Sequence, residues 1–114
     1  MDPEGLYKLA LDARHAGEYG KAKLYLDAVL GSNPNHVEAR YLYALVKGFE
    51  GDFDGSLADL TTLYGQNPGH LDIKYDLAMT QMMLGMYEEA CGLLKEILAV
   101  DPTHEKANQQ AAFC

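Results

Sequence analysis

A fixed interval of 34 residues between similar residues limits most strongly what this chain can fold into. Each interval holds a glycine, an aromatic residue two positions later and a proline near its end. These landmarks are Gly17, Tyr19 and Pro34, then Gly51, Phe53 and Pro68, then Gly85, Tyr87 and Pro102. Because the interval contains no insertion, it indicates a stack of equivalent structural units.

Each unit predicts two helices. In the first unit, Pro3 is tolerated in an opening helical turn, and Leu6, Leu9, Ala10 and Ala13 follow at the spacing of one buried helical face. Gly17 supplies the left-handed conformation that ends a helix at low cost. A second helix, with Ala22, Leu26 and Val29 inward, runs to Asn33-Pro34. The alanines let the paired backbones approach closely.

The pattern resembles the tetratricopeptide repeat family, whose units carry the same glycine, aromatic residue and proline with small residues between them. The small residues here are Ala10, Ala44 and Ala78, and Ala22, Ser56 and Ala90. The resemblance implies an all-α solenoid of antiparallel helix pairs in a right-handed superhelix. We expect one domain over residues 1–114, with repeats at 3–36, 37–70 and 71–104.

Some residues depart from the family pattern. Where the family usually has a large apolar residue, the repeats have Leu6, Arg40 and Lys74, and where it often has tyrosine they have Ala13, Lys47 and Gln81. Residues 105–114 begin another helix, with Ala107 and Ala111 in the apolar positions. They are either a short cap or the start of a longer array.

Composition narrows the class of protein. Hydrophobic residues make up 48% of the chain, which favours a folded core, and no run of about 18 apolar residues predicts a membrane span. The net charge of −8 disfavours nucleic acid as a partner. The acidic opening, Met1-Asp2-Pro3-Glu4, does not resemble a signal peptide, so we expect a cytoplasmic protein. Cys91 and Cys114 predict no disulfide framework: Cys91 is expected as a small helix residue and Cys114 as a free thiol.

The resemblance also implies a binding groove, lined by the first helix of each repeat. Its expected members are Tyr7, Leu11, Glu38, Tyr41, Leu42, Leu45, Phe49, Asp72, Tyr75, Asp76, Met79, Met82 and Met83. Tyrosine is enriched at interfaces, and methionine adapts to varied partners. The strip is therefore expected to be apolar and aromatic with acidic edges, although the same side chains could simply fill space between repeats.

One ligand known for the family is disfavoured. Repeats that bind the acidic tails of heat-shock chaperones use lysine, arginine and asparagine at five places. Those places hold Tyr7, Leu11, Leu42, Asp72 and Asp76. Without the cations, an incoming carboxylate would meet like charge instead of charge-assisted hydrogen bonds.

The repeated histidines, His36, His70 and His104, do not predict a joint metal site. Packed helices lie about 8–10 Å apart, whereas zinc needs its ligand nitrogens about 2 Å away. We expect these histidines in the loops before the next helix. No nucleophile, phosphate-binding or metalloprotease motif indicates an enzyme or a cofactor.

Two functions remain from the sequence. The first is a scaffold that binds an apolar or amphipathic segment of another protein, with neutral or basic flanks. The second is a self-associating repeat module that forms a homodimer or larger homo-oligomer through its end helices.

Overall fold

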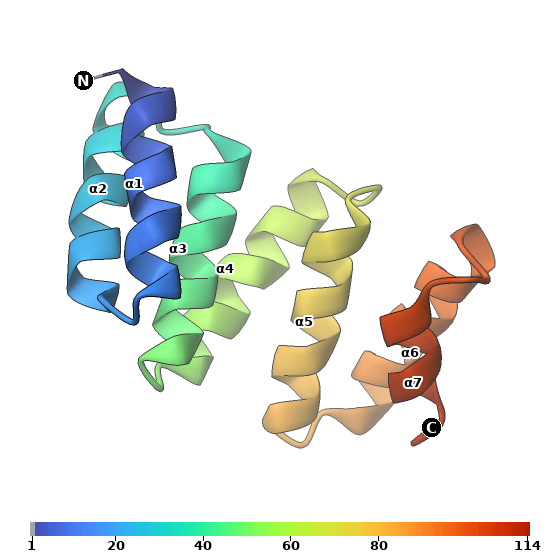
Figure 1. Ribbon diagram of the computed structural model, residues 1–114. Coiled ribbons are helices and arrows are strands. Elements are labelled where there is room, and N and C mark those ends of the chain that lie inside the picture. Colours follow the sequence, from blue (N-terminus) through green and yellow to red (C-terminus); the bar gives the residue numbers. More distant parts are fainter. Residues whose placement is uncertain (1) are drawn as a thin grey trace. The chain divides into compact units, whose positions relative to one another are not determined.

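The computed structural model describes residues 2–114; Met1 lies outside it. The described part contains helices and no strand (Figure 1), so the expected all-α repeat fold is confirmed. The helices are α1 (Pro3–His15), α2 (Tyr19–Ser32), α3 (Val37–Phe49), α4 (Phe53–Gln66), α5 (Leu71–Met83), α6 (Tyr87–Val100) and α7 (Glu105–Ala111). The starting residues of α1, α3, α5 and α7 are separated by the 34-residue interval of the sequence.

The turns inside the repeats are set by glycine. Gly17, Gly51 and Gly85 have φ angles of 76°, 93° and 80°, in the left-handed region that other residues avoid. They are the positive-φ residues of the described chain. Each therefore ends the first helix of its repeat as expected, and the second helix begins two residues later.

The recurring histidines start the helices that follow them. Nδ1 of His36, His70 and His104 accepts a hydrogen bond from the backbone N–H of Ala39, Ile73 and Ala107, at 3.0, 3.2 and 3.0 Å. A side-chain acceptor at this place satisfies one of the backbone donors that a helix leaves open at its beginning. The histidines do lie between repeats, and their function there is N-capping.

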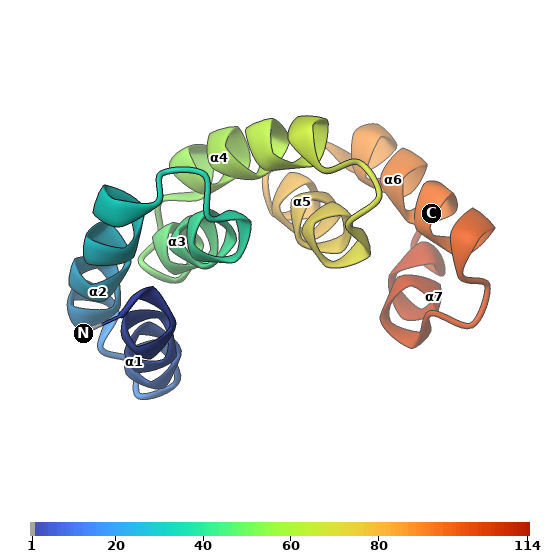
Figure 2. The same ribbon diagram turned by 90° about the horizontal axis from the view of Figure 1, so that it is seen from above.

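The chain forms two compact units, one ending at Asp59 and the other beginning at Leu60. In the first unit, α1 and α3 lie side by side and both pack against α2 (Figure 2). Its core contains Ala10, Ala13, Ala22, Leu26, Val29, Ala39, Leu42 and Val46. In the second unit, α6 packs against α5 and α7. Its buried apolar residues include Leu60, Leu63, Ile73, Leu77, Ala78, Ala90, Leu94, Ile97 and Ala107.

The equivalent leucines of the second helices are fully buried. Leu26, Leu60 and Leu94 are each 0% exposed. Ala10 on α1 and Ala22 on α2 are also 0% exposed. The three leucines are thus buried, as the repeat pattern predicted.

A buried lysine replaces the usual apolar residue in the third repeat. Lys74 on α5 is 7% exposed, and its Nζ lies 3.5 Å from Oε1 of Glu96 on α6 and 5.5 Å from the ring centre of Tyr64 on α4. The hydroxyl of Tyr64 donates to the same Glu96 oxygen at 3.2 Å. The aliphatic stem of Lys74 fills the apolar position while its amine reaches a carboxylate at the edge of the core.

The prediction for the cysteines was wrong. Cys91 on α6 and Cys114, which follows α7, form a disulfide with their Cα atoms 5.9 Å apart. They are separated by 23 residues in the sequence. The turn after α6 brings α7 back against α6, and this tertiary contact places the two sulfurs within bonding distance.

Across residues 2–114, none of the helices combines the length and apolar character needed to cross a lipid bilayer.

Candidate protein-binding surface

In the first unit, the predicted surface is centred on Tyr7 of α1. Its ring lies 5.7 Å from the ring of His36, and Nε2 of that histidine is 3.6 Å from Oε1 of Glu4. Partial burial raises the pKa of the Tyr7 phenol, and the charges of Glu38 and Glu4 raise it further, while Arg14 opposes them. The tyrosine ring therefore lies against the histidine and close to two carboxylates.

Phe49, the last residue of α3, is 47% exposed. Its ring stacks on that of Tyr19, with the centres 5.7 Å apart, and the guanidinium of Arg14 lies 4.9 Å from its centre. This cation–π contact shows how the aromatic surface of the first unit accepts a positive charge.

One predicted member is not available to a partner. Leu42 is 3% exposed and belongs to the core of the first unit, so its prediction as a surface residue was wrong. Leu42 directly follows Tyr41 in the sequence, but its side chain belongs to the core cluster that includes residues of α1 and α2. Leu11, Tyr41 and Leu45 remain half-buried, and Glu38 is exposed.

In the second unit, Tyr75 of α5 repeats the arrangement of Tyr7. Its ring stacks on that of His104 with the centres 5.7 Å apart. Burial raises the pKa of its phenol, and the nearby charge of Asp76 adds to this effect. Each of these tyrosines thus packs on the histidine that ends its own repeat, a pairing that the two recurring residues could have suggested from the sequence.

The other predicted surface residues of the second unit also lie on α5. Met83 is 65% exposed, whereas Met79 and Met82 are half-buried. Asp72 is exposed in the first turn of the helix. The helix therefore offers flexible apolar side chains on the same element as its carboxylates.

Comparisons with known proteins support the assignment of the fold. A family model described as tetratricopeptide repeat matches residues 50–113, and a second with the same description matches residues 7–46. The first alone covers more than half of the 114 residues. The seven described helices define an all-α repeat protein. The chain belongs to the tetratricopeptide repeat family.

Solved structures show the same fold. MamA (residue 41 to its end) from Desulfovibrio magneticus RS-1 is 25% identical, with a TM-score of 0.85 over 98% of this chain. YrrB, described as a TPR protein with an unusual peptide-binding site, is 24% identical, with a TM-score of 0.83 over 96% of this chain. The first TPR of Spaghetti (RPAP3), bound to the HSP90 peptide SRMEEVD, is 14% identical, with a TM-score of 0.86 over 96% of this chain.

The matches differ in how much of each relative they include. The chain covers 63% of the MamA structure, 57% of YrrB and 87% of the Spaghetti repeat. It thus spans less than two thirds of the first two. No match to a curated protein was found.

Proposed function

We propose that the chain is a non-catalytic scaffold whose first-helix surfaces bind an apolar or amphipathic segment of a partner protein with neutral or basic flanks. The observation that carries this proposal is the tyrosine repeated at equivalent places in α1, α3 and α5. Tyr7 and Tyr75 are each held against a histidine ring and lie close to acidic side chains. A ring that is ordered before binding loses little conformational entropy when a partner covers it.

The charges favour a basic flank over an acidic one. Residues 37–70 carry a net charge of −3 and residues 71–104 a net charge of −4. Two of the places that hold cations in the chaperone-tail repeats hold Asp72 and Asp76 here. The peptide SRMEEVD, which the Spaghetti repeat binds, is itself acidic, so we do not expect it to bind this chain.

The test is a binding titration with three peptides. Two are amphipathic helices with the same apolar face, one flanked by lysines and one by glutamates, and the third is SRMEEVD. We expect the lysine-flanked peptide to bind most tightly and raised salt to weaken it. Equal binding of all three, or preference for an acidic peptide, would contradict the proposed charge selection.

Two variants locate the surface. Tyr41→Ala should weaken binding of the lysine-flanked peptide by about 2 kcal/mol, which is roughly 30-fold, because binding energy concentrates in central aromatic side chains. Leu24→Ala, on α2, removes an apolar side chain that is 69% exposed and should bind like the parent. Equal loss in both variants, or none in Tyr41→Ala, would place the binding surface elsewhere. The double change Asp72→Asn and Asp76→Asn should mainly slow association.

A further inference from the structure

The disulfide of the second unit stands where the first unit has an ion pair. In the first unit, Nζ of Lys23 on α2 lies 2.7 Å from Oε1 of Glu50, which directly follows α3. Cys91 holds the place of Lys23 in the third repeat, two intervals of 34 residues later. It bonds to Cys114, just beyond α7. In both units, this place on the second helix is connected to the end of the following helix, but only Cys91–Cys114 is covalent and open to redox chemistry.

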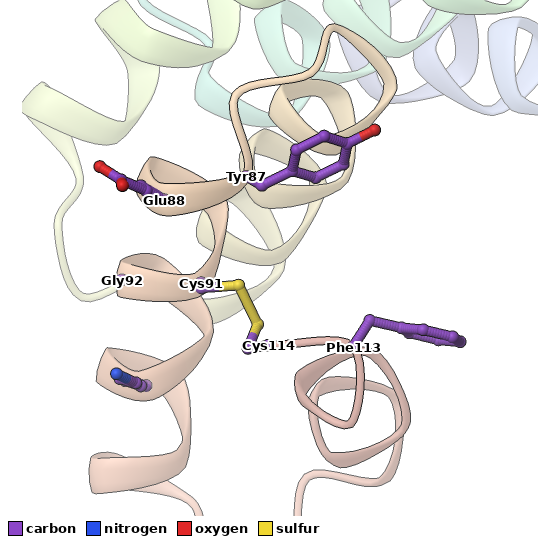
Figure 3. A pocket seen from close by; sticks show the side chains of 7 residues that line it. Tyr87, Glu88, Cys91, Gly92, Phe113 and Cys114 are labelled. Atoms are coloured by element: carbon purple, nitrogen blue, oxygen red, sulfur yellow. A yellow bond between two sulfur atoms is a disulfide. The ribbon is translucent and has the colours of Figure 1, made fainter.

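Both cysteine residues lie at the surface. Cys114 is exposed and Cys91 is half-buried. They lie in an open depression of about 460 Å³ whose other lining residues include Tyr87, Lys95 and Phe113. Figure 3 shows the sulfur–sulfur bond reaching from α6 to the residues after α7, with the two aromatic rings projecting beyond it. The bond is therefore not sealed in the core, as a purely structural disulfide often is.

Gly92 contributes to this access. Glycine is a weaker helix former than alanine, and Gly92 lines the same depression as the two cysteines. Here a Cβ at Gly92 would meet nothing within 4 Å. The equivalent residue of the first repeat, Leu24, is 69% exposed on its helix. The fold thus tolerates a large side chain at this place, and the glycine leaves the flank of Cys91 uncovered.

We propose that Cys91–Cys114 is a thiol-exchange site, opened by dithiol reductants, and that its redox state decides whether α7 stays docked on α6. A thiolate of the dithiol attacks Sγ of Cys114, and the bond to Cys91 breaks. Cys91 leaves as a thiolate and takes a proton from water. The second thiol of the reductant then attacks the reductant sulfur that is bonded to Cys114, and Cys114 is released as a thiol. Two electrons pass to the cysteine pair, and the dithiol becomes a disulfide.

Two charged side chains near Cys91 affect how readily it leaves as a thiolate. Lys95 lies one helical turn after Cys91 on α6, and its positive charge favours the departing thiolate. Glu88, one turn before Cys91, acts in the opposite direction. We assign the attack to Cys114 because it is the more exposed residue of the pair.

Reduction of the disulfide affects α7. This helix has seven residues, and Ala107 is the buried one among them. It packs against α6 and is tied to it by the disulfide, so reduction removes one of the two constraints that hold it there. In a compartment kept reduced by glutathione, the pair would stand as thiols and α7 would be free to detach. In an oxidising compartment it would stay docked.

The test uses the oxidised full chain with and without dithiothreitol under native conditions. We expect two alkylatable thiols per chain after reduction, and backbone amide exchange in residues 105–114 that is faster by about tenfold or more, with α5 unchanged. The Cys91→Ser, Cys114→Ser double variant should show the faster exchange under both conditions. Thiols that appear only in denaturant, or exchange that does not change on reduction, would refute the proposal.

The role of Gly92 in access to the disulfide and the choice of the attacked cysteine are tested in separate experiments. Gly92→Leu should slow reduction several-fold, whereas Gly92→Ala should leave the rate close to that of the parent. With excess glutathione, peptide mapping should find the mixed disulfide on Cys114. An adduct mainly on Cys91, or equal rates in the two Gly92 variants, would overturn the assigned geometry.

Discussion

Truncation of Leu60 to alanine tests the central packing of the repeats. Leu60 on α4 is 0% exposed and equivalent to Leu26 and Leu94, which are also fully buried. Replacing a buried leucine by alanine loses transfer free energy and leaves a cavity, at a cost of about 2.7–5 kcal/mol. Since the neighbouring helices are held by their own packed residues, the site has little room to collapse, and we expect a loss of about 3 kcal/mol or more.

The loss should be measurable by both denaturant and heat. A chain of this size has a total stability of roughly 6–17 kcal/mol, so the change removes a large part of it. At about 4 °C per kcal/mol, the midpoint of thermal unfolding should fall by about 12 °C. Circular dichroism through a urea titration gives the free energy of unfolding, and the slope with urea should be unchanged if the native fold persists.

A matched control separates the cavity from the chemistry of the substitution. Leu24→Ala makes the same change at a side chain that is 69% exposed. It should alter the free energy of unfolding by less than about 0.5 kcal/mol. A Leu60→Ala variant as stable as the parent, or a control that loses as much, would refute the alignment of the repeats on which the packing argument rests.

Three further predictions follow from the caps, the turns and the tyrosines. His70→Ala should lower the free energy of unfolding by about 1 kcal/mol, because the N–H of Ile73 loses its acceptor, while His70→Asn should retain most of it in the same urea titration. Gly85→Ala should destabilise by about 1–2 kcal/mol because φ is 80° there, whereas Gly92→Ala, inside a helix, should be neutral or stabilising. The raised pKa of Tyr75, due to burial and then to Asp76, stabilises the fold below the unfolded pKa of 10.0, and this stability is lost as the pH rises through the folded value. Tyr75→Phe should therefore flatten the fall in urea midpoint between about pH 9 and pH 11, and an unchanged slope would contradict the shift.

The helices that carry the candidate tyrosines could be predicted from the sequence because these residues recur at the repeat interval. The pattern placed Tyr7, Tyr41 and Tyr75 at equivalent places, and they lie on α1, α3 and α5 as expected. It assigned both Tyr41 and Leu42 to the surface, although adjacent helical residues point about 100° apart and Leu42 shares the spacing of the buried Ala39 and Val46. Leu42 is buried because α1 and α2 cover that side of α3.

The sequence by itself determined the helices and their boundaries. Glycine at positive φ, proline after a helix and apolar residues at helical spacing act through the local backbone, so they have the same effect in every repeat. The 34-residue interval of the sequence therefore reappears in the helix boundaries, from Pro3 to Val37 to Leu71 to Glu105.

The tertiary structure alone decided the contacts between distant residues. Lys74 is accommodated because Tyr64 and Glu96, on two other helices, meet at its amine. The pairing of Cys91 with Cys114 depends on the direction in which α7 returns along α6. Such contacts join residues that share no local pattern, and their free energy is realised only when several helices are packed at once.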